Sequence, residues 1–379
     1  MSDVMSELPA YTVGRALAPV VAARLADHRT RAATESGVVV ADSPLPDAAI
    51  ISTLVDAAFW ASLRREEGYV PTISLVYLPP RIDVHPLAFA RPLSLDPAGL
   101  ARLGPAVEQP GVHLGVWWQD ERLMVWGTTR TIPPFSFVVE VVAPGLIVLK
   151  HRPHEGSRKF VNLAVIEGDT VKVIDEQAPL LPACPALLTD LLGHDGTSAP
   201  TTSAQMLVQL AVSMRRHRRG GTLLVVPDES TTWEQSIVSP IAYAVKPGFG
   251  ELAQFVREGV NDAEVREAVR AVAGLTAVDG ATIVREDYTL LAFGAKIRRR
   301  QGSPQVDELI LTEPVVGNQP TRVTPGQVGG TRHLSAAQFV ADQKEGLALV
   351  ASQDGRFTLF AWSPTDQLVH AHRVDALLV

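Results

Sequence analysis

Apolar residues recur at helical spacing at the start of the sequence and gather into short runs further along it. Over residues 11–35 they fall on one stripe of a helix, and over residues 46–65 they do so again, with Asp47 placed to cap the second helix. The apolar run at residues 72–77 ends at a pair of prolines and is typical of a strand. The sequence therefore predicts two helices and a strand near its beginning.

Three pairs of strand-like runs follow between residues 112 and 176. The members of each pair are separated by a short turn segment, at residues 119–121, 144–145 and 167–169. Strands that follow one another through such turns pair as antiparallel hairpins. We therefore expect residues 1–195 to form an α+β domain rich in antiparallel hairpins.

The pattern changes after a stretch rich in Pro, Gly and Ser, in which residues 194–200 are the best linker candidate. Beyond it, helical stripes alternate with apolar runs, which predicts an α/β domain over residues 200–379. Residues 228–260 are interpreted as an irregular excursion with one helix, and residues 301–329 as a lid or an insertion. The predicted helices lie at residues 203–214, 261–273 and 335–344, and the predicted strands at 222–227, 282–284, 288–292, 347–351 and 357–361.

Composition and charge narrow the function classes. With 379 residues, 46% hydrophobic and 20% charged, the chain fits two ordinary globular domains. A net charge of −7 argues against nucleic-acid binding through a basic surface, although a small nucleotide needs only a local basic pocket. Cys184 is the single cysteine, so the chain forms no intramolecular disulfide and fits a reducing compartment. No apolar run is long enough to span a membrane and the N-terminus lacks a signal-peptide pattern, so we expect a cytoplasmic location.

The first candidate binding motif is Asp279-Gly280-Ala281, directly before an apolar run. Glycine lets a ligand approach the backbone closely, and the aspartate beside it can bind Mg²⁺ or Mn²⁺ through its carboxylate oxygens. Asp-Gly is also among the commonest turn dipeptides, so this pattern alone favours an ordinary turn.

The second stretch, Gly330-Thr331-Arg332-His333, precedes a predicted helix. The N-terminus of a helix offers free N–H groups and a positive dipole end to a phosphate. Arg332 can contact phosphate oxygens in a bidentate manner, and Thr331 and His333 add donors. A simple helix cap beside an unrelated turn is the alternative interpretation.

Together and in this order, the two stretches resemble the Asp-Gly-Ala and Gly-Thr-Arg-His-Arg motifs of diadenylate cyclases, the DAC family. The resemblance covers roughly the C-terminal half of the chain. It implies a mixed α/β domain with a central twisted sheet flanked by helices, with Asp279, Arg332 and His333 as catalytic residues and with Asp279 and Asp354 on a metal. The nucleotide contacts that it implies are Gly280, Ala281, Gly330, Thr331, Arg332, His333 and Ser352.

The resemblance implies an activity as well. A diadenylate cyclase condenses two ATP molecules into cyclic di-AMP and two pyrophosphates with Mg²⁺ or Mn²⁺ present. Each domain holds one ATP, so two domains meet face to face, and the expected partners are ATP and a second copy of the chain, in a homodimer or a higher even oligomer. Neither a membrane nor nucleic acid is an expected partner.

The N-terminal half carries a shorter resemblance. Ser62 and Leu63, followed by Glu66-Glu67-Gly68 before a strand, resemble the sensor domains that precede some DAC domains. This implies a small ligand of unknown identity near the two glutamates and a gating role for the domain. A solvated helix end closed by Gly68 is the simpler interpretation of the same residues.

Two positions depart from the family pattern. Leu334 stands where the family has a second arginine, and Gln353-Asp354 stands where the family has two glutamates. These departures keep a second hypothesis open, a degenerate domain that binds a nucleotide without chemistry. The long 301–329 segment motivates a third, a nucleotidyltransferase that makes a different nucleotide signal.

Overall fold

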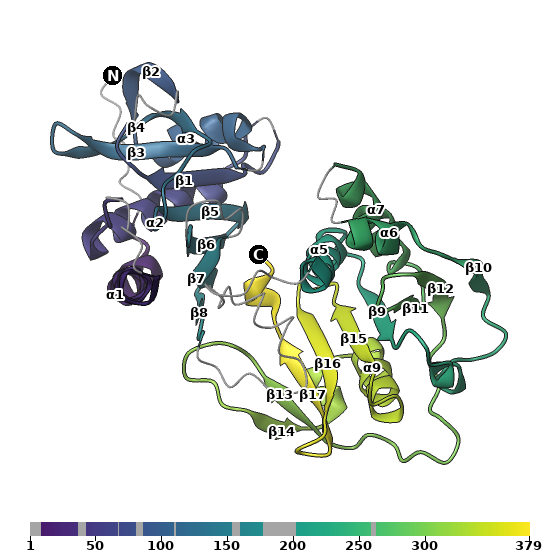
Figure 1. Ribbon diagram of the computed structural model, residues 1–379. Helices are drawn as coiled ribbons and strands as arrows, with labels where there is room; N and C mark the ends of the chain where they lie inside the picture. The colour runs from purple at the N-terminus through teal and green to yellow at the C-terminus, as the bar shows by residue number, and fades with distance from the viewer. Residues whose placement is uncertain are drawn as a thin grey trace. The chain divides into compact units, whose positions relative to one another are not determined.

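The computed structural model describes residues 9–36, 43–66, 68–80, 86–109, 111–153, 160–176, 202–258 and 263–379. The chain divides into two compact units, Met1–Ile174 and Asp175–Val379, and each is described by itself (Figure 1). Several predicted features lie outside the described residues, namely the linker at 194–200, Cys184, Glu67 and the capping residue Asn261.

The N-terminal unit is one eight-stranded sheet with helices, in the strand order β2-β4-β3-β1-β5-β6-β7-β8. The β1–β3 pair is parallel and the other neighbours are antiparallel, and the three predicted hairpins are present as β3–β4, β5–β6 and β7–β8. Its elements are α1 (Thr12–Ser36), α2 (Ala48–Ser62), β1 (Ile73–Tyr77), β2 (Leu87–Ser94), α3 (Pro97–Leu103), η2 (Gly104–Val107), β3 (His113–Gln119), β4 (Arg122–Thr129), β5 (Phe137–Ala143), β6 (Leu146–His151), β7 (Val161–Glu167) and β8 (Thr170–Val173).

Helix α2 begins as the sequence predicts and ends earlier than it predicts. The Asp47 side chain accepts a hydrogen bond from the N–H of Ile50, which satisfies one of the free donors of the first turn. The helix ends at Ser62 with Leu63 as its C-cap, so the expected closure by Gly68 is wrong. Gly68, at φ +87°, lies instead in a tight turn in which Glu66 and Tyr69 exchange two backbone hydrogen bonds.

The C-terminal unit is a nine-stranded mixed sheet in the order β10-β12-β11-β9-β15-β16-β17-β13-β14, which confirms the mixed α/β class. The β9–β11 and β13–β17 pairs are parallel and the rest are antiparallel. Its elements are α5 (Thr202–Arg216), β9 (Gly221–Val226), η3 (Thr232–Ser236), β10 (Tyr243–Phe249), α6 (Glu251–Glu258), α7 (Ala263–Leu275), β11 (Ala281–Arg285), β12 (Leu290–Ala295), β13 (Leu309–Thr312), β14 (Thr321–Val323), α8 (Pro325–Val328), α9 (Thr331–Asp342), β15 (Leu347–Ala351), β16 (Phe357–Ser363), β17 (Leu368–Arg373) and η4 (Asp375–Leu377).

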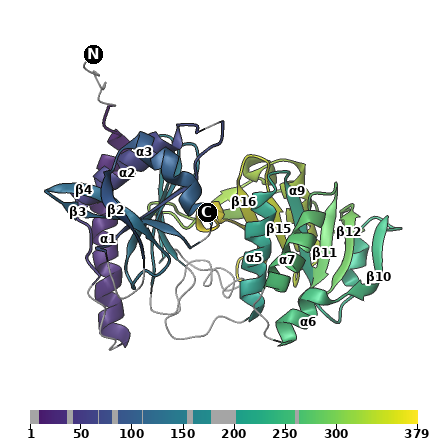
Figure 2. The same ribbon diagram turned by 90° about the horizontal axis from the view of Figure 1, so that it is seen from above.

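Helices cover both faces of this sheet (Figure 2). Helices α5 and α7 pack on one face, where Leu223 of β9 lies in the core, and α9 packs on the other, where Leu224 lies in a separate core. Neighbouring residues of a strand point to opposite faces, so a strand buried on both sides is apolar throughout. Residues 221–226 fit this rule, because all six are buried and the last four are Leu or Val.

The structure adds detail to three sequence interpretations. Residues 228–260 contain an α-helix, α6, as expected, and also the edge strand β10, which was not expected. Residues 301–329, interpreted as a lid or an insertion, contain the β13–β14 hairpin at the edge of the sheet, beside β17. Helix α9 begins at Thr331 rather than at Ser335, so the Thr-Arg-His stretch is its first turn.

Candidate functional site

One end of the C-terminal sheet collects the connections that carry the predicted site. Strands β9, β11 and β16 begin there, strands β12 and β15 end there, and helix α9 begins there. We call this region the site end. It comprises residues 217–220, 276–280, 296, 329–333 and 352–356.

Asp279 lies in the turn between α7 and β11. The next residue, Gly280, has φ +118°, and a Cβ there would overlap the backbone of Gly294, so only glycine fits this close approach. The Asp279 side chain is 88% exposed, and Lys296 Nζ donates a hydrogen bond to its Oδ2. This hydrogen bond and the Lys296 charge, with a smaller contribution from Arg332, lower the pKa of the Asp279 carboxyl below its usual value. The group is therefore an ionised, accessible carboxylate at neutral pH.

Helix α9 begins without a side-chain cap from the described residues. Gly330 is its N-cap, and the N–H groups of His333 and Leu334 donate to the Gly330 carbonyl. The N–H groups of the first turn that precede these point out of the helix start, as in any α-helix. The helix start is thus a positive dipole end suited to an anion.

Arg332 bridges the start of α9 and the turn before β9. Its Nη1 lies 3.0 Å from the place that a Cβ on Gly220 would occupy, and the Gln353 side chain lies against the same place. Gly220 has φ +70°, so glycine suits this position on conformational grounds as well. The Arg332 guanidinium therefore lies among three separate connections of the sheet.

His333 is buried, unlike the donor that the sequence predicts. Its ring fills the space beside Gly329, where a Cβ would overlap it, and it meets Phe360 edge-on at 6.0 Å between ring centroids. Burial lowers the pKa of His333, so the neutral ring is favoured. Nε2 of this ring has no hydrogen-bond partner among the described residues.

The turn between β15 and β16 holds the remaining predicted residues. The N–H of Ser352 donates to the Arg356 carbonyl at 2.9 Å, and Asp354 forms an ion pair with Arg356 at 3.5 Å. Gln353 Nε2 donates to the Arg219 carbonyl at 3.3 Å, which ties this turn to the connection before β9. Asp279 and Asp354 thus lie at the same end of the sheet in two separate ion pairs.

Sequence reasoning missed the role of Lys296. The residue opens a basic run after a predicted strand, and nothing in that run distinguishes it from its neighbours. The signal lies in the pairing register: Ala281 of β11 is opposite Ala295 of β12, which brings the Asp279 turn beside residue 296.

The side chains at the site end can be compared with what a divalent metal ion requires. Among the described residues, no group of three or more His, Cys, Asp or Glu side chains could hold a metal ion. Mg²⁺ keeps several waters and is commonly bound by one or two carboxylates together with substrate phosphates. The exposed Asp279 carboxylate fits a metal that arrives with a triphosphate and does not fit a metal held by protein alone.

Part of the N-terminal unit matches the model of a known protein family. Residues 41–130 match the family described as Probable sensor domain DACNV. Within the described residues the match runs from α2 to β4. This match supports the DAC-associated sensor domain that the sequence predicts in the N-terminal half.

Two solved structures resemble parts of the chain weakly. A hypothetical membrane spanning protein from Bacillus cereus is 16% identical with a TM-score of 0.27, over 45% of this chain and 62% of that one. A double-cysteine mutant of DacA from Staphylococcus aureus is 15% identical with a TM-score of 0.24, over 44% of this chain and 83% of that one. The chain spans less than two thirds of the first protein, and TM-scores at this level carry no argument about activity.

Two further findings complete the comparison. No curated protein matches the sequence. In the part of the chain that the structure describes, no helix combines the length and the apolar character that crossing a membrane requires.

Proposed function

We propose that the C-terminal unit is a diadenylate cyclase domain, which joins two ATP molecules into cyclic di-AMP, and that the N-terminal unit gates it as a sensor. The observation that carries the proposal is the gathering of Asp279, Arg332 and the Ser352 turn at one end of one sheet, from three distant parts of the chain. The match of residues 41–130 to the DACNV sensor family supports the proposal independently.

The phosphates belong at the start of α9. Arg332 offers a planar pair of N–H donors that matches phosphate oxygens, and the helix start adds backbone N–H groups and a favourable dipole. The Thr331 hydroxyl lies in the same turn and serves as a further donor. His333 acts through position, because its buried ring holds the first turn of α9 against Gly329 and Phe360.

A divalent ion would be held by Asp279 together with the triphosphate. When bound, it polarises the α-phosphoryl group and neutralises charge on the departing pyrophosphate. Asp354, in the β15–β16 turn at the same end of the sheet, would be the second carboxylate available to this ion. Lys296 would compete with the ion for Oδ2 of Asp279, to which it donates a hydrogen bond.

The two ATP molecules play identical parts in the reaction. The 3′-oxygen of each ATP forms a bond to the α-phosphorus of the other, the bond from that phosphorus to the pyrophosphate oxygen breaks, and the hydroxyl proton leaves to solvent. One chain supplies one such half-site, so two site ends face each other across a two-fold axis. The assembly is then a dimer or a higher even oligomer.

The test is incubation of the purified full chain with ATP and Mn²⁺ or Mg²⁺, followed by mass analysis of the products. Cyclic di-AMP is expected, and Asp279→Asn should abolish it. Asp307→Asn is the matched control, because Asp307 is an exposed carboxylate before β13, at the opposite end of the sheet. A linear or mixed dinucleotide from mixed nucleoside triphosphates would replace the proposal with a different nucleotidyltransferase.

A second candidate is a domain that binds a nucleotide without turnover. The observations that favour it are the ammonium of Lys296 on Asp279 and the 41% exposed Leu334 in the first turn of α9. Because Leu334 faces solvent, Leu334→Arg adds a cation there without repacking the core. Turnover gained by Leu334→Arg with Gln353→Glu in an inert parent would favour this candidate, and an active parent would exclude it.

A further inference from the structure

A pair of stacked aromatic rings lies at the same end of the sheet as the proposed phosphate site. Tyr243 of β10 is directly opposite Phe293 of β12, and the two rings are parallel within 2° with centroids 4.8 Å apart. Tyr243 is 52% exposed. One face of the tyrosine ring is therefore backed by Phe293, while about half of the Tyr243 side chain remains accessible.

The backbone around this pair admits the tyrosine ring. Gly294 has φ +61°, and a Cβ on it would come within 2.8 Å of Tyr243 Cδ2 and 3.4 Å of Val278 Cγ1. The absence of a side chain at Gly294 thus lets the ring lie beside the turn that carries Asp279. Tyr11 and Phe59 form a comparable stack in the N-terminal unit, but there Tyr11 is buried, so core packing accounts for that pair. Core packing does not account for Tyr243, because half of its side chain is exposed.

The strand order sets the distance between the aromatic pair and the phosphate-binding residues. From β10 the sheet continues through β12 and β11 to β9, beside which Arg332 lies. Three strand spacings of roughly 4.8 Å each amount to about 14 Å. This is comparable to the reach of an extended nucleoside triphosphate, with the Asp279 turn, before β11, two of the three spacings from the aromatic pair.

We infer that Tyr243, backed by Phe293, is the platform on which the base of the bound nucleotide stacks. This inference rests on the proposed function, and it adds the residue that binds the base of the nucleotide. Aromatic side chains stack on bases through their faces, and a ring held by a second ring is already ordered before the base arrives. The ribose would then lie at the Asp279-Gly280 turn and the phosphates at Arg332.

The experiment compares two probes on the full chain by calorimetry. An ATP analogue with a methylene group between the α and β phosphates reports on base and phosphates together, and inorganic triphosphate reports on the phosphates alone. Tyr243→Ala should weaken the ATP analogue about tenfold, the loss that removal of one base–aromatic stack produces, and leave triphosphate unchanged. Tyr243→Phe keeps the ring and should match the parent, whereas Tyr243→Leu should behave as Tyr243→Ala.

Phe249→Ala is the matched control, because Phe249 is a 47% exposed aromatic residue at the other end of the same strand. Unchanged binding of the analogue to Tyr243→Ala, or equal loss of both probes, would overturn the platform while the parent still binds nucleotide. A parent that binds neither probe would overturn the proposed function itself and the platform with it, and the two failures are thereby distinguished.

Discussion

Lys296, directly after β12, donates a hydrogen bond to Asp279, in the turn before β11, at the open end of the β11–β12 pair, and both side chains are mostly exposed. An ammonium therefore occupies the carboxylate that the proposed chemistry needs for a metal. Exposed ion pairs of this kind are weak and exchange readily with water and ions. The contact holds Asp279 ionised, and under the proposed function the same ammonium would be available to the phosphates of a bound nucleotide.

Replacing Lys296 by methionine should change metal and phosphate binding in opposite directions. Without the ammonium, both oxygens of Asp279 are open, so Mn²⁺ alone should bind about two- to fivefold more tightly, the range of an exposed ion pair. Inorganic triphosphate should bind more weakly because one cation is lost. Calorimetric titration with each probe separately measures both effects.

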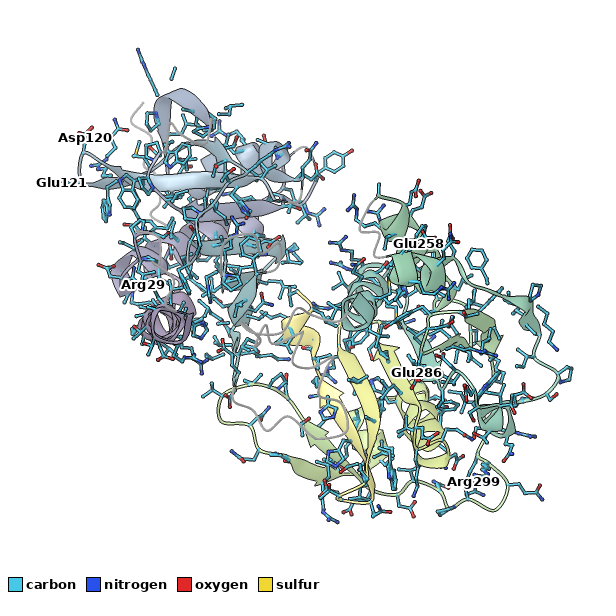
Figure 3. All side chains as sticks on the ribbon, viewed as in Figure 1. Arg29, Asp120, Glu121, Glu258, Glu286 and Arg299 are labelled. Atoms are coloured by element: carbon cyan, nitrogen blue, oxygen red, sulfur yellow. The ribbon has the colours of Figure 1, made fainter. Side chains whose placement is uncertain are left out.

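Arg299→Met is the control for the Lys296 variant, because it removes a cation from the same basic run. Arg299 lies on the loop away from the site end (Figure 3), next to Arg300, whose N–H donates to Asp342 at the far end of α9. Equal changes in Arg299→Met and Lys296→Met would mean that general charge, and not the contact with Asp279, sets both affinities.

Gly329→Ala should damage the start of α9. The added Cβ would overlap the His333 ring, which has nowhere to move because it is buried against Phe360. We expect a loss of about 1–3 kcal/mol in the free energy of unfolding, as for other overpacked sites, together with weaker triphosphate binding. Urea unfolding and calorimetry check the two parts.

Gly326→Ala serves as the comparison for Gly329→Ala, since a Cβ at Gly326 meets nothing within 4 Å and the residue lies in helix α8. Alanine in a helix is at least as favourable as glycine, so stability should be kept or rise slightly. A Gly329→Ala protein as stable as Gly326→Ala would show that the His333 ring is not fixed in place.

The stability of the N-terminal unit should fall as the pH is lowered through the histidine range. Burial, and then the Lys150 charge, lower the pKa of His113 from 6.5 to about 4, and Ser74 Oγ lies 2.8 Å from its Nδ1. The unfolded chain then binds a proton that the folded chain refuses, so stability is full above pH 6.5 and is lost between 6.5 and about 4. The shift corresponds to about 3 kcal/mol.

His113→Asn tests this pH dependence, because asparagine keeps a polar partner for Ser74 and cannot titrate. The urea midpoint of the variant should be lower than that of the parent at pH 7 and should change less between pH 7 and pH 5. Parallel curves for the two proteins would assign the acid sensitivity of the N-terminal unit to groups other than His113.

Asp47→Ala should destabilise the N-terminal unit by about 1 kcal/mol, because the N–H of Ile50 loses its acceptor at the start of α2. Asp47→Ser keeps an acceptor and should recover most of the loss. Urea unfolding of both variants measures the difference. Equal stability of the alanine and serine variants would mean that the cap adds nothing to α2.

The fold could be predicted where apolar and polar residues follow a single helical or strand pattern along the sequence. The buried strand at residues 221–226 and the hairpins of the N-terminal unit follow from apolar runs and turn residues. The hairpin tip at Asp120 and Glu121 even adopts positive φ values, as its two-residue turn requires (Figure 3). Strand β10 was missed because Pro247 and Gly248 interrupt its alternation, and only an edge strand tolerates such residues.

The site was predictable as a set of residue types and not as a geometry. The sequence names Asp279, Arg332 and His333, but polar residues are ordinarily exposed, so nothing in it indicates that the His333 ring is buried. The contact of Lys296 with Asp279 depends on a register that passes two bulges in the β11–β12 pair. A bulge shifts the pairing by one residue, and local patterns do not reveal it.

The links between the connections at the site end also determine when this site can exist during synthesis. Gln353 reaches the Arg219 carbonyl from 134 positions away in the sequence, and Arg215 reaches the Gly355 carbonyl from 140. Closing loops of this length carries a large entropic cost that only the completed sheet offsets, so the connections at the site end come together late in folding. Under the proposed function, a nascent chain would gain its affinity for a nucleotide only after β16 has left the ribosome, and nucleotide binding would report that folding of this unit is complete.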